Sequence, residues 1–365
     1  MSPAETSTLF TDQLSSASNG ISSTLPNYQK LIRLHRSLLS LLDCLIQLPN
    51  LISALKELSR HHHLSDTSLH QVLQNFSVIQ LLLRNESDRI KAVIWELPER
   101  STEMATLILK HLVAKSALQK LNFKHHLEFV RHSDLQTLSP KSWLNGEIIN
   151  YFVEKWCAGS DTLGLGTYWA NKFLFEDKNC TKPWSSFDNS SKIVNDLKRS
   201  IQKREQRLDT VRWSKIYIPI NNAEEAHWYC AVINFEEHTI GILDSWGPTF
   251  RTNRDKPLRQ KKHTALLAAL MWVTERVAEY RGETVVLARN PHTDWSCDPH
   301  VEVPLQPNGY DCGVHMLWHL YHIVNFGHVQ PLNSKIPKPH QFADNMVAKR
   351  LRLVQEILDD AGFRF

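Results

Sequence analysis

The chain has 365 residues, of which 42% are apolar, enough to form an extensive hydrophobic core and to allow two domains. Its formal net charge of +4 is small for this length and does not indicate nucleic-acid binding. Six widely spaced cysteines without a CxxC pair exclude a disulfide framework, and no apolar run is long enough to span a bilayer. The first residues also lack the basic and apolar regions of a signal peptide, so we expect an intracellular protein of the nucleus or cytoplasm without membrane attachment.

The N-terminal third divides into a tail and a helical region. Residues 1–25 are rich in Ser and Thr and poor in large apolar residues, which predicts a disordered tail. Across 26–122, leucines recur at spacings of three and four, as amphipathic helices require. We predict an all-α region of three to five helices there. We interpret it as a scaffold or as a module that docks a protein partner.

From about residue 127 the pattern changes to that of a separate domain. Leu138-Ser-Pro-Lys-Ser-Trp143 predicts a turn and a helix cap, and 144–156 predicts a helix. The basic run at 198–207 is typical of a helix with a solvated face. Contact with an acidic patch, or nuclear import, is the less favoured interpretation of this run. The apolar periodicity of 342–358 predicts a helix that closes the domain.

Three β-branched runs, at 216–220, 227–234 and 239–245, are separated by short turns. Runs of this kind are typical of an antiparallel meander. His227 begins the second run and Asp244 lies at the end of the third. We therefore expect these two side chains at neighbouring strand ends on one edge of the sheet, within reach of each other.

The segment Gln306-Pro-Asn-Gly-Tyr-Asp-Cys312-Gly313 precedes an apolar run that predicts a helix. Cys312 would then lie at a helix N-terminus, where the macrodipole favours the thiolate. A nearby imidazole can take the proton of the thiol, and a carboxylate can orient that imidazole. Together with His227, Asp244 and the side-chain amide of Gln306, Cys312 therefore forms the candidate nucleophilic site of a cysteine protease.

The other cysteines and the histidines after Cys312 could in principle bind a metal, but structural roles explain them better. The remaining five cysteines are most simply small buried apolar residues. His315, His319 and His322 lie at i, i+4 and i+7 on the predicted cysteine helix, but no carboxylate lies between the first two. We expect neither a metal nor another cofactor.

The chain resembles the Ulp/SENP-type proteases, which cleave SUMO and related ubiquitin-like modifiers, and more distantly the adenoviral protease. That family has the order His, Asp, Gln, Cys, with a His-Trp pair, an Asp-Ser pair, a Gln-x-x-x-x-Asp-Cys-Gly segment and an upstream Trp-Leu-Asn motif. The matching segments are His227-Trp228, Asp244-Ser245, Gln306–Gly313 and Trp143-Leu-Asn145. The resemblance covers about 127–365. It implies a papain-like, adenain-like α+β fold with a central mixed or antiparallel sheet flanked by helices, after the all-α region.

The resemblance also implies roles for individual residues. It assigns Cys312 as the nucleophile, His227 as the general base and then acid, Asp244 as the orienting carboxylate and Gln306 as the oxyanion donor. Loss of one oxyanion donor typically lowers the rate by about 100- to 1,000-fold. Trp143 and Trp228 would form the walls of a narrow tunnel over the scissile Gly-Gly tail. Diglycine has no side chains, so two flat aromatic walls would admit it and exclude bulkier residues. Asp311 is assigned to supporting the cysteine turn.

Three features depart from the family pattern. Gly146 follows Trp-Leu-Asn where an acidic residue is frequent, and Trp246 follows Asp-Ser where smaller residues are common. The interval 245–311 is long and contains a basic segment at 251–262 and a predicted helix at 263–280. An insertion beside the site adds specificity or restricts access, so SUMO is the leading candidate among several modifiers.

We therefore expect a peptidase or isopeptidase that cleaves after the Gly-Gly of SUMO or a related modifier, to mature precursors or to release conjugated lysines. The first alternative is a catalytically silent modifier-binding protein, which the intact Cys, His, Asp and Gln argue against. The second is an acyltransferase, or a related protease with a non-modifier substrate. An acyltransferase needs an acyl-CoA pocket, for which the sequence gives no sign.

Overall fold

The structure is a computed structural model, and almost all of the residues it describes belong to one compact unit of the chain. The described residues are 121, 130–139, 141–176, 181–182, 187, 191–210, 212–222, 224–288, 290, 292–329 and 346–362. The predicted tail at 1–25 and, apart from Leu121, the predicted helices at 26–122 lie outside these residues.

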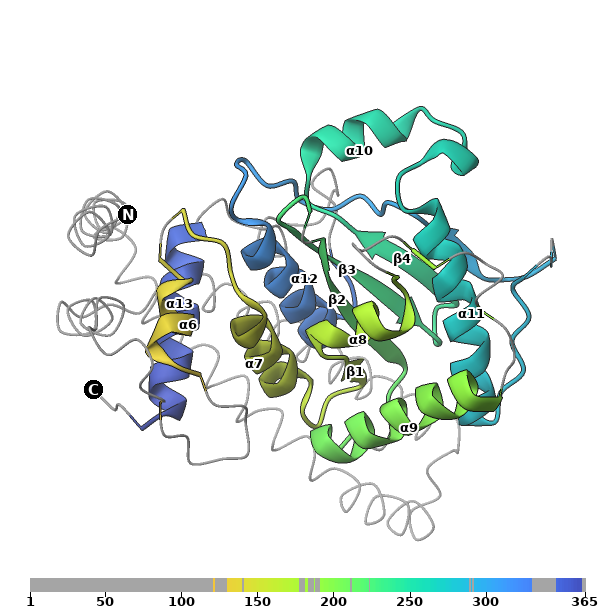
Figure 1. Cartoon of the computed structure of the whole chain (residues 1–365), viewed down its shortest axis with the longest axis horizontal. Helices are drawn as coiled ribbons and strands as arrows, with labels where there is room; N and C mark the ends of the chain where they lie inside the picture. The colour runs from red at the N-terminus through yellow and green to blue at the C-terminus, as the bar shows by residue number, and fades with distance from the viewer. Residues whose placement is uncertain are drawn as a thin grey trace, which may run out of the picture. The chain divides into compact units, whose positions relative to one another are not determined.

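The described part of the chain forms helices and the strands of a single sheet (Figure 1). The helices are α6 (His132–Gln136), α7 (Gly146–Cys157), α8 (Thr167–Phe173), α9 (Ser191–Leu208), α10 (Gly247–Arg254), η3 (Leu258–Gln260), α11 (Thr264–Arg281), α12 (Cys312–Phe326) and α13 (Met346–Asp360). The strands are β1 (Thr162–Gly164), β2 (Lys215–Asn222), β3 (His227–Asn234), β4 (Thr239–Leu243) and β5 (Ser296–Asp298). Among these helices, none combines the length and the apolar character needed to cross a bilayer.

The five strands form one mixed sheet in the order β1-β2-β3-β4-β5. β2, β3 and β4 pair antiparallel, while β1 and β5 add parallel strands at the two edges. The predicted meander is therefore confirmed, and the second strand begins at His227 as expected. The α+β fold with a mixed sheet flanked by helices is also confirmed.

The central strands are buried on both faces. Consecutive residues Ile216, Tyr217 and Ile218 of β2 are all inaccessible to solvent, which requires cover on each side of the sheet. α12 packs against β3 and α7, whereas α8 contacts β2 and α11 contacts β4. The Tyr217 hydroxyl donates a hydrogen bond of 2.8 Å to the carbonyl of Met316, which fixes α12 to its face of the sheet.

The start of α7 is set by its cap. The side chain of Asn145 accepts a hydrogen bond from the backbone N–H of Ile148 at 3.1 Å, as a helix N-cap requires. The amide group of Asn145 also donates to Asp134 at 2.8 Å, so the cap is held by α6. Trp143 and Leu144 therefore occupy a fixed segment immediately before the helix.

Candidate active site

His227 and Asp244 meet at one edge of the sheet. His227 is the first residue of β3, and Asp244 directly follows β4, the neighbouring antiparallel strand. His227 Nε2 lies 2.6 Å from Asp244 Oδ1. An ionised carboxylate only accepts hydrogen bonds, so Nε2 carries the proton and Nδ1 is left for the thiol. The predicted proximity of the two side chains is thus observed.

Asp244 is fully buried and accepts hydrogen bonds from several groups. Besides His227, the backbone N–H of Trp246 donates to Oδ1 at 2.9 Å, and His263 Nε2 donates to Oδ2 at 3.1 Å. Burial alone would raise the pKa of the Asp244 carboxyl. The hydrogen bonds and charges of His227 and His263 outweigh it and hold this pKa well below its usual range. Asp244 is therefore a fixed negative charge at neutral pH.

The imidazole of His227 connects Asp244 to Cys312. Burial lowers the pKa of His227, but hydrogen bonds to Asp244 and to the Cys312 sulfur, with the charges of both groups, raise it to about 9. A protonated imidazole beside a thiolate is the reactive form of a Cys–His pair. The structure thus brings together the Cys312 thiol, the His227 imidazole and the Asp244 carboxylate that orients it.

Cys312 is the first residue of α12 and is only 1% exposed. Its position at the N-terminus of a 15-residue helix is the predicted one, and there the helix dipole stabilises a negative charge. Gly313 permits the close approach of this helix end to Leu144, because a Cβ at Gly313 would lie 3.0 Å from the Leu144 Cβ. The glycine after the cysteine thus lets the helix pack against the segment before α7.

Gln306 is held beside Ser245, in the segment that follows β4. Its backbone N–H donates to the carbonyl of Ser245 at 2.8 Å, and Ser245 Oγ donates to Gln306 Oε1 at 2.7 Å. Gln306 Nε2 donates one of its two protons to the carbonyl of Asn308 at 2.7 Å. This fixes the amide orientation and leaves the second proton of Nε2 for another acceptor.

Arg350, on α13, holds the cysteine loop in place. Its guanidinium forms an ion pair of 2.8 Å with Asp311, and its side chain is almost completely buried. It also donates hydrogen bonds to the carbonyls of Thr137, Ser139, Ser142 and Tyr310. Asn308 donates to the second oxygen of Asp311 at 2.7 Å. Asp311 therefore supports the turn before the cysteine, the role the sequence assigned to it.

Replacement of Arg350 should destabilise the fold. Arg350→Met leaves Asp311 as a buried charge without its cation, a change that typically costs about 3–5 kcal/mol. We expect a decrease in Tm on the order of 10 °C in thermal unfolding of the full chain. Arg352→Met is the matched control, because Arg352 on the same helix is more exposed and lies 3.9 Å from Glu356. Equal losses of stability in the two variants would contradict this role.

The indole N–H groups of both tryptophans donate hydrogen bonds to backbone carbonyls near the candidate site. Trp143 Nε1 donates to the carbonyl of Gly309 in the cysteine loop at 2.8 Å. Trp228 Nε1 donates to the carbonyl of Leu144 at 2.8 Å. Trp143 is 55% exposed whereas Trp228 is 5% exposed. Each indole is thus fixed beside the candidate site, but only Trp143 presents a broad surface to solvent.

His263 and His300 both form hydrogen bonds to Asp244 that the sequence did not predict. His300 Nε2 donates to the carbonyl of Asp244 at 3.2 Å, and Asn253 Nδ2 donates to His300 Nδ1 at 3.2 Å. Potential ligand atoms of Asp244, His263 and His300 lie within 4.8 Å of one another, a spacing compatible with a metal ion. Because the ring nitrogens already serve hydrogen bonds that fix Asp244, we interpret the three residues as a hydrogen-bonded network.

The histidines of α12 lie in the protein core. His315, His319 and His322 are each at most 2% exposed. Burial lowers the pKa values of His315 and His319 to about 3, so both imidazoles are neutral at physiological pH.

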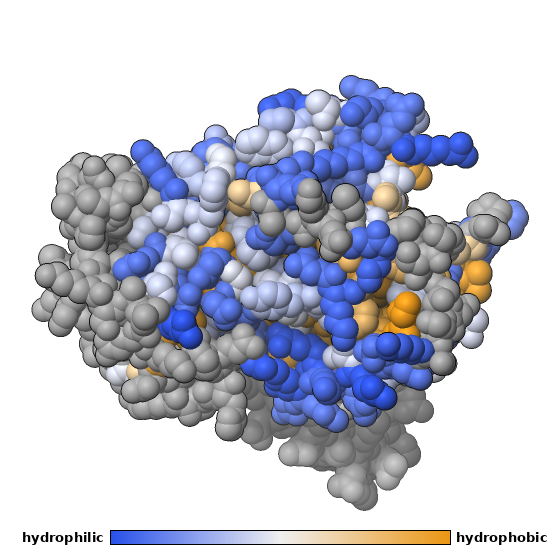
Figure 2. All heavy atoms as spheres, viewed as in Figure 1, coloured by the Kyte–Doolittle hydropathy of each residue, from blue (hydrophilic) through white to orange (hydrophobic). Residues whose placement is uncertain are grey.

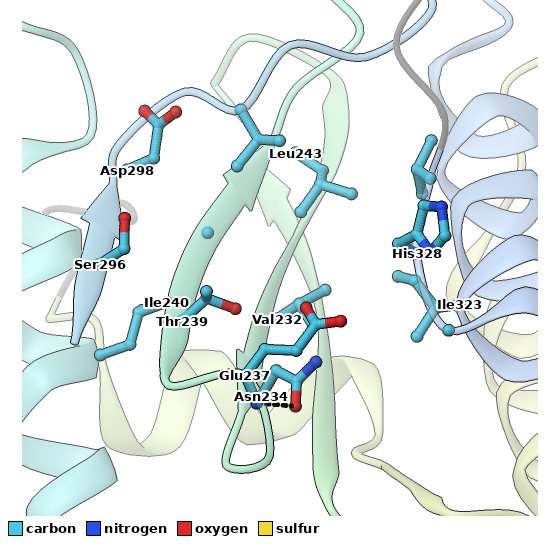
Figure 3. A pocket seen from close by; sticks show the side chains of 14 residues that line it. Val232, Asn234, Glu237, Thr239, Ile240, Leu243, Ser296, Asp298, Ile323 and His328 are labelled. Atoms are coloured by element: carbon cyan, nitrogen blue, oxygen red, sulfur yellow. Dashed lines mark hydrogen bonds between the residues drawn. The ribbon is translucent and has the colours of Figure 1, made fainter. Parts of the chain in front are cut away.

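A cavity of about 250 Å³ lies on another part of the sheet (Figure 3). Its lining comes from β3, β4, β5 and the end of α12, with apolar side chains such as Val232, Leu243 and Ile323. None of the site residues predicted from the sequence lines it. The candidate active site is therefore separate from this cavity.

Comparisons with known proteins agree with this arrangement. The model of the Ulp1 protease family, C-terminal catalytic domain, matches residues 143–353, more than half of the chain. Ubiquitin-like-specific protease 1 of Saccharomyces cerevisiae is 25% identical over 60% of this chain and 29% of its own length. A sentrin-specific protease of Caenorhabditis elegans is 26% identical over 62% of this chain and 26% of its own length. The chain thus spans less than a third of the length of these two relatives.

Solved structures show the same fold. The C-terminal Ulp1 protease domain, solved in complex with Smt3, the yeast ortholog of SUMO, superimposes with a TM-score of 0.51 at 22% sequence identity. The similarity covers 72% of this chain and 97% of that one. With the family match over 143–353, it follows that the chain belongs to the Ulp1 protease family.

Proposed function

We propose that the chain is a cysteine peptidase that cleaves after the C-terminal Gly-Gly of SUMO or a related ubiquitin-like modifier. Such an enzyme matures modifier precursors, releases modifiers from lysine side chains, or does both. The observation that carries the proposal is the position of the His227 imidazole. It lies 2.6 Å from Asp244 and is hydrogen-bonded to the Cys312 sulfur. The named relatives are modifier-specific proteases, which supports the substrate class.

In the first step the Cys312 thiolate attacks the carbonyl carbon of the terminal glycine. The carbonyl oxygen becomes an oxyanion, for which the free proton of Gln306 Nε2 and the backbone N–H of Cys312 are the proposed donors. His227 then protonates the leaving amine, and the C–N bond breaks. The modifier remains attached to Cys312 as a thioester.

In the second step water hydrolyses the thioester. The now neutral His227 takes a proton from the water, whose oxygen attacks the thioester carbonyl, and the Cys312 thiolate leaves. Asp244 remains ionised throughout and holds the imidazole in one tautomer. The step restores the imidazolium and thiolate and releases the modifier as a carboxylic acid, which loses its proton to the solvent.

The two tryptophans are proposed to guide the tail. Their hydrogen bonds to Gly309 and Leu144 fix both indoles on segments adjacent to Cys312. The exposed ring of Trp143 is suited to cover a chain without side chains, while buried Trp228 supports the floor of the path. Diglycine would fit such a path, and bulkier residues would be excluded.

The proposed catalytic domain spans 127–365. We further propose that the enzyme acts in the nucleus or cytoplasm, where a reducing environment preserves a thiol nucleophile. Residues 26–122 are proposed to dock a protein partner.

The proposal is tested with purified full-length chain and a panel of ubiquitin-like modifiers that carry a thiol-reactive group at the C-terminal glycine. We expect a covalent adduct with at least one modifier in intact-mass spectra, and no adduct with Cys312→Ala. A folded protein that reacts with no modifier would contradict the proposal. An adduct that persists in Cys312→Ala would contradict the assignment of the nucleophile.

A further inference from the structure

A strongly basic segment projects beside the candidate active site. Residues 251–262, here called the basic arm, carry six basic side chains and one acidic side chain. The arm comprises the last turn of α10, the helix η3 and their connections. α10 lies at the top of Figure 1, and the surface over it is hydrophilic in Figure 2. The arm is thus a surface feature with a concentrated positive charge.

The basic arm is anchored to the groups that position the site. The helix α10, whose last turn opens the arm, begins at Gly247, directly after Asp244-Ser245-Trp246, and a Cβ at Gly247 would lie 3.6 Å from Leu305. Farther along, buried Asn253 accepts a hydrogen bond from the backbone N–H of Lys262 at 2.9 Å and also bonds His300. Since His300 in turn donates to the Asp244 carbonyl, the arm has a fixed position relative to the catalytic carboxylate.

Most of the positive charges on the arm have no counterion in the described part of the chain. Lys262 pairs with Glu225 at 2.6 Å. No ion pair within the described residues involves the other basic side chains of the arm, which are Arg251, Arg254, Lys256, Arg259 and Lys261. The first four of these are exposed. On α9, by contrast, Arg204 and Arg207 both bind Glu154. The arm therefore offers charge that a partner can neutralise.

We infer that the basic arm binds acidic residues of the protein from which the modifier is released. The inference rests on the proposed function. The Trp246 ring lies 6.2 Å from that of His227, and Trp246 is the cap of α10, so the helix that leads into the arm starts on the imidazole side of the Cys–His pair. The imidazole delivers its proton to the leaving amine, and the target protein that carries this amine must therefore lie near the arm. A protein partner is favoured over nucleic acid because the adjoining site receives protein.

The test compares isopeptide substrates in which one modifier is attached to a lysine flanked either by glutamates or by glutamines. The variant R251Q/R254Q/K256Q/R259Q removes four exposed charges from the arm, and the control K192Q/R199Q/K203Q removes three exposed charges from α9. Each exposed ion pair changes affinity by a small factor, so four together should lower kcat/KM for the acidic substrate on the order of 10-fold. The effect should shrink between about 0.05 and 0.5 M salt.

A third substrate, the modifier with a small fluorogenic amide at its C-terminus, isolates the contribution of the target. The arm variant should cleave it at the wild-type rate, because it has no acidic flank. Equal losses on all three substrates, or equal wild-type rates for glutamate and glutamine flanks, would overturn the inference.

A binding measurement separates failure of the arm from failure of the proposed catalysis. Fluorescence anisotropy with Cys312→Ala and the labelled glutamate-rich peptide should show salt-sensitive binding that R251Q/R254Q/K256Q/R259Q loses. Absence of this binding would refute the arm inference whatever the enzyme cleaves. Tighter binding of a single-stranded oligonucleotide that displaces the peptide would also refute it, and would identify the arm as a nucleic-acid surface.

Discussion

Cys312→Ala is expected to abolish cleavage of a modifier precursor while leaving modifier binding nearly unchanged. The substitution removes one sulfur atom from a side chain that is only 1% exposed, so the surface that contacts the folded modifier is preserved. Without the thiol no thioester can form, and the oxyanion donors alone give only slow hydrolysis. Turnover is followed by gel electrophoresis and binding by calorimetry.

Cys297→Ala is the control for this experiment. Cys297 lies on β5 and is the most accessible of the four cysteines in the described part of the chain, whereas Cys312 is buried. Burial raises the pKa of the Cys297 thiol, which makes it a poor nucleophile. Full activity in Cys297→Ala and none in Cys312→Ala would identify the nucleophile. Substantial turnover by Cys312→Ala would refute the mechanism.

Asp244→Asn should lower kcat by about 10⁴-fold, the effect that the same change has in a serine-protease triad. Asp244 accepts hydrogen bonds from both His227 and His263 through its two oxygens. An asparagine has one oxygen acceptor and one NH₂ donor, so it cannot accept from both histidines. One imidazole must change its tautomer or rotate, and the catalytic pair loses its alignment.

The same substitution should shift the pH dependence of the residual activity. In the wild type kcat/KM should fall as the pH rises through about 9, because His227 then loses the proton that the leaving amine requires. Asp244→Asn removes a hydrogen bond and a negative charge that raise this pKa, while burial still lowers it. The alkaline limb of the kcat/KM profile should therefore move to lower pH.

A surface pair provides the matched control for Asp244→Asn. His238 and Asp294 also form a His–Asp contact, at 2.5 Å, but both side chains are substantially exposed. Asp294→Asn should leave kcat/KM and its pH profile unchanged, since an exposed pair contributes little. A rate loss in Asp244→Asn below about 10-fold would show that the carboxylate does not orient the imidazole.

The features predicted from the sequence are those encoded over short distances. The β-branched run at 227–234 forms a strand with these bounds, and the apolar run after Cys312 forms α12. The turn before the cysteine is also local, so its residue types indicate its role directly. The helix predicted at 144–156 forms as α7, but it begins at Gly146 with Asn145 as its cap, and the cap predicted within 138–143 is wrong. The four catalytic candidates lie next to such elements.

The missed residues act over long distances or lack a pattern. Arg350 sits in a helix whose periodicity predicts only packing, and its partners lie far away in the chain. His263 is one of 19 histidines, and nothing around it indicates that the start of α11 reaches Asp244. The basic run on α9 was predicted to be a solvated face, which is wrong for Arg204, because the helix turns it toward buried Glu154. Tertiary packing, not local sequence, decides these contacts.

The position of Arg350 also has a consequence for folding kinetics. Its hydrogen bonds join residues separated by as many as 213 positions, so the chain must close a very long loop before they form. Contacts of such high order are expected late on the folding pathway, after the meander and the local helix caps. Because these contacts hold the turn that precedes Cys312, an incompletely folded molecule has a thiol without an organised site around it. The nucleophile would then be assembled only as folding nears completion.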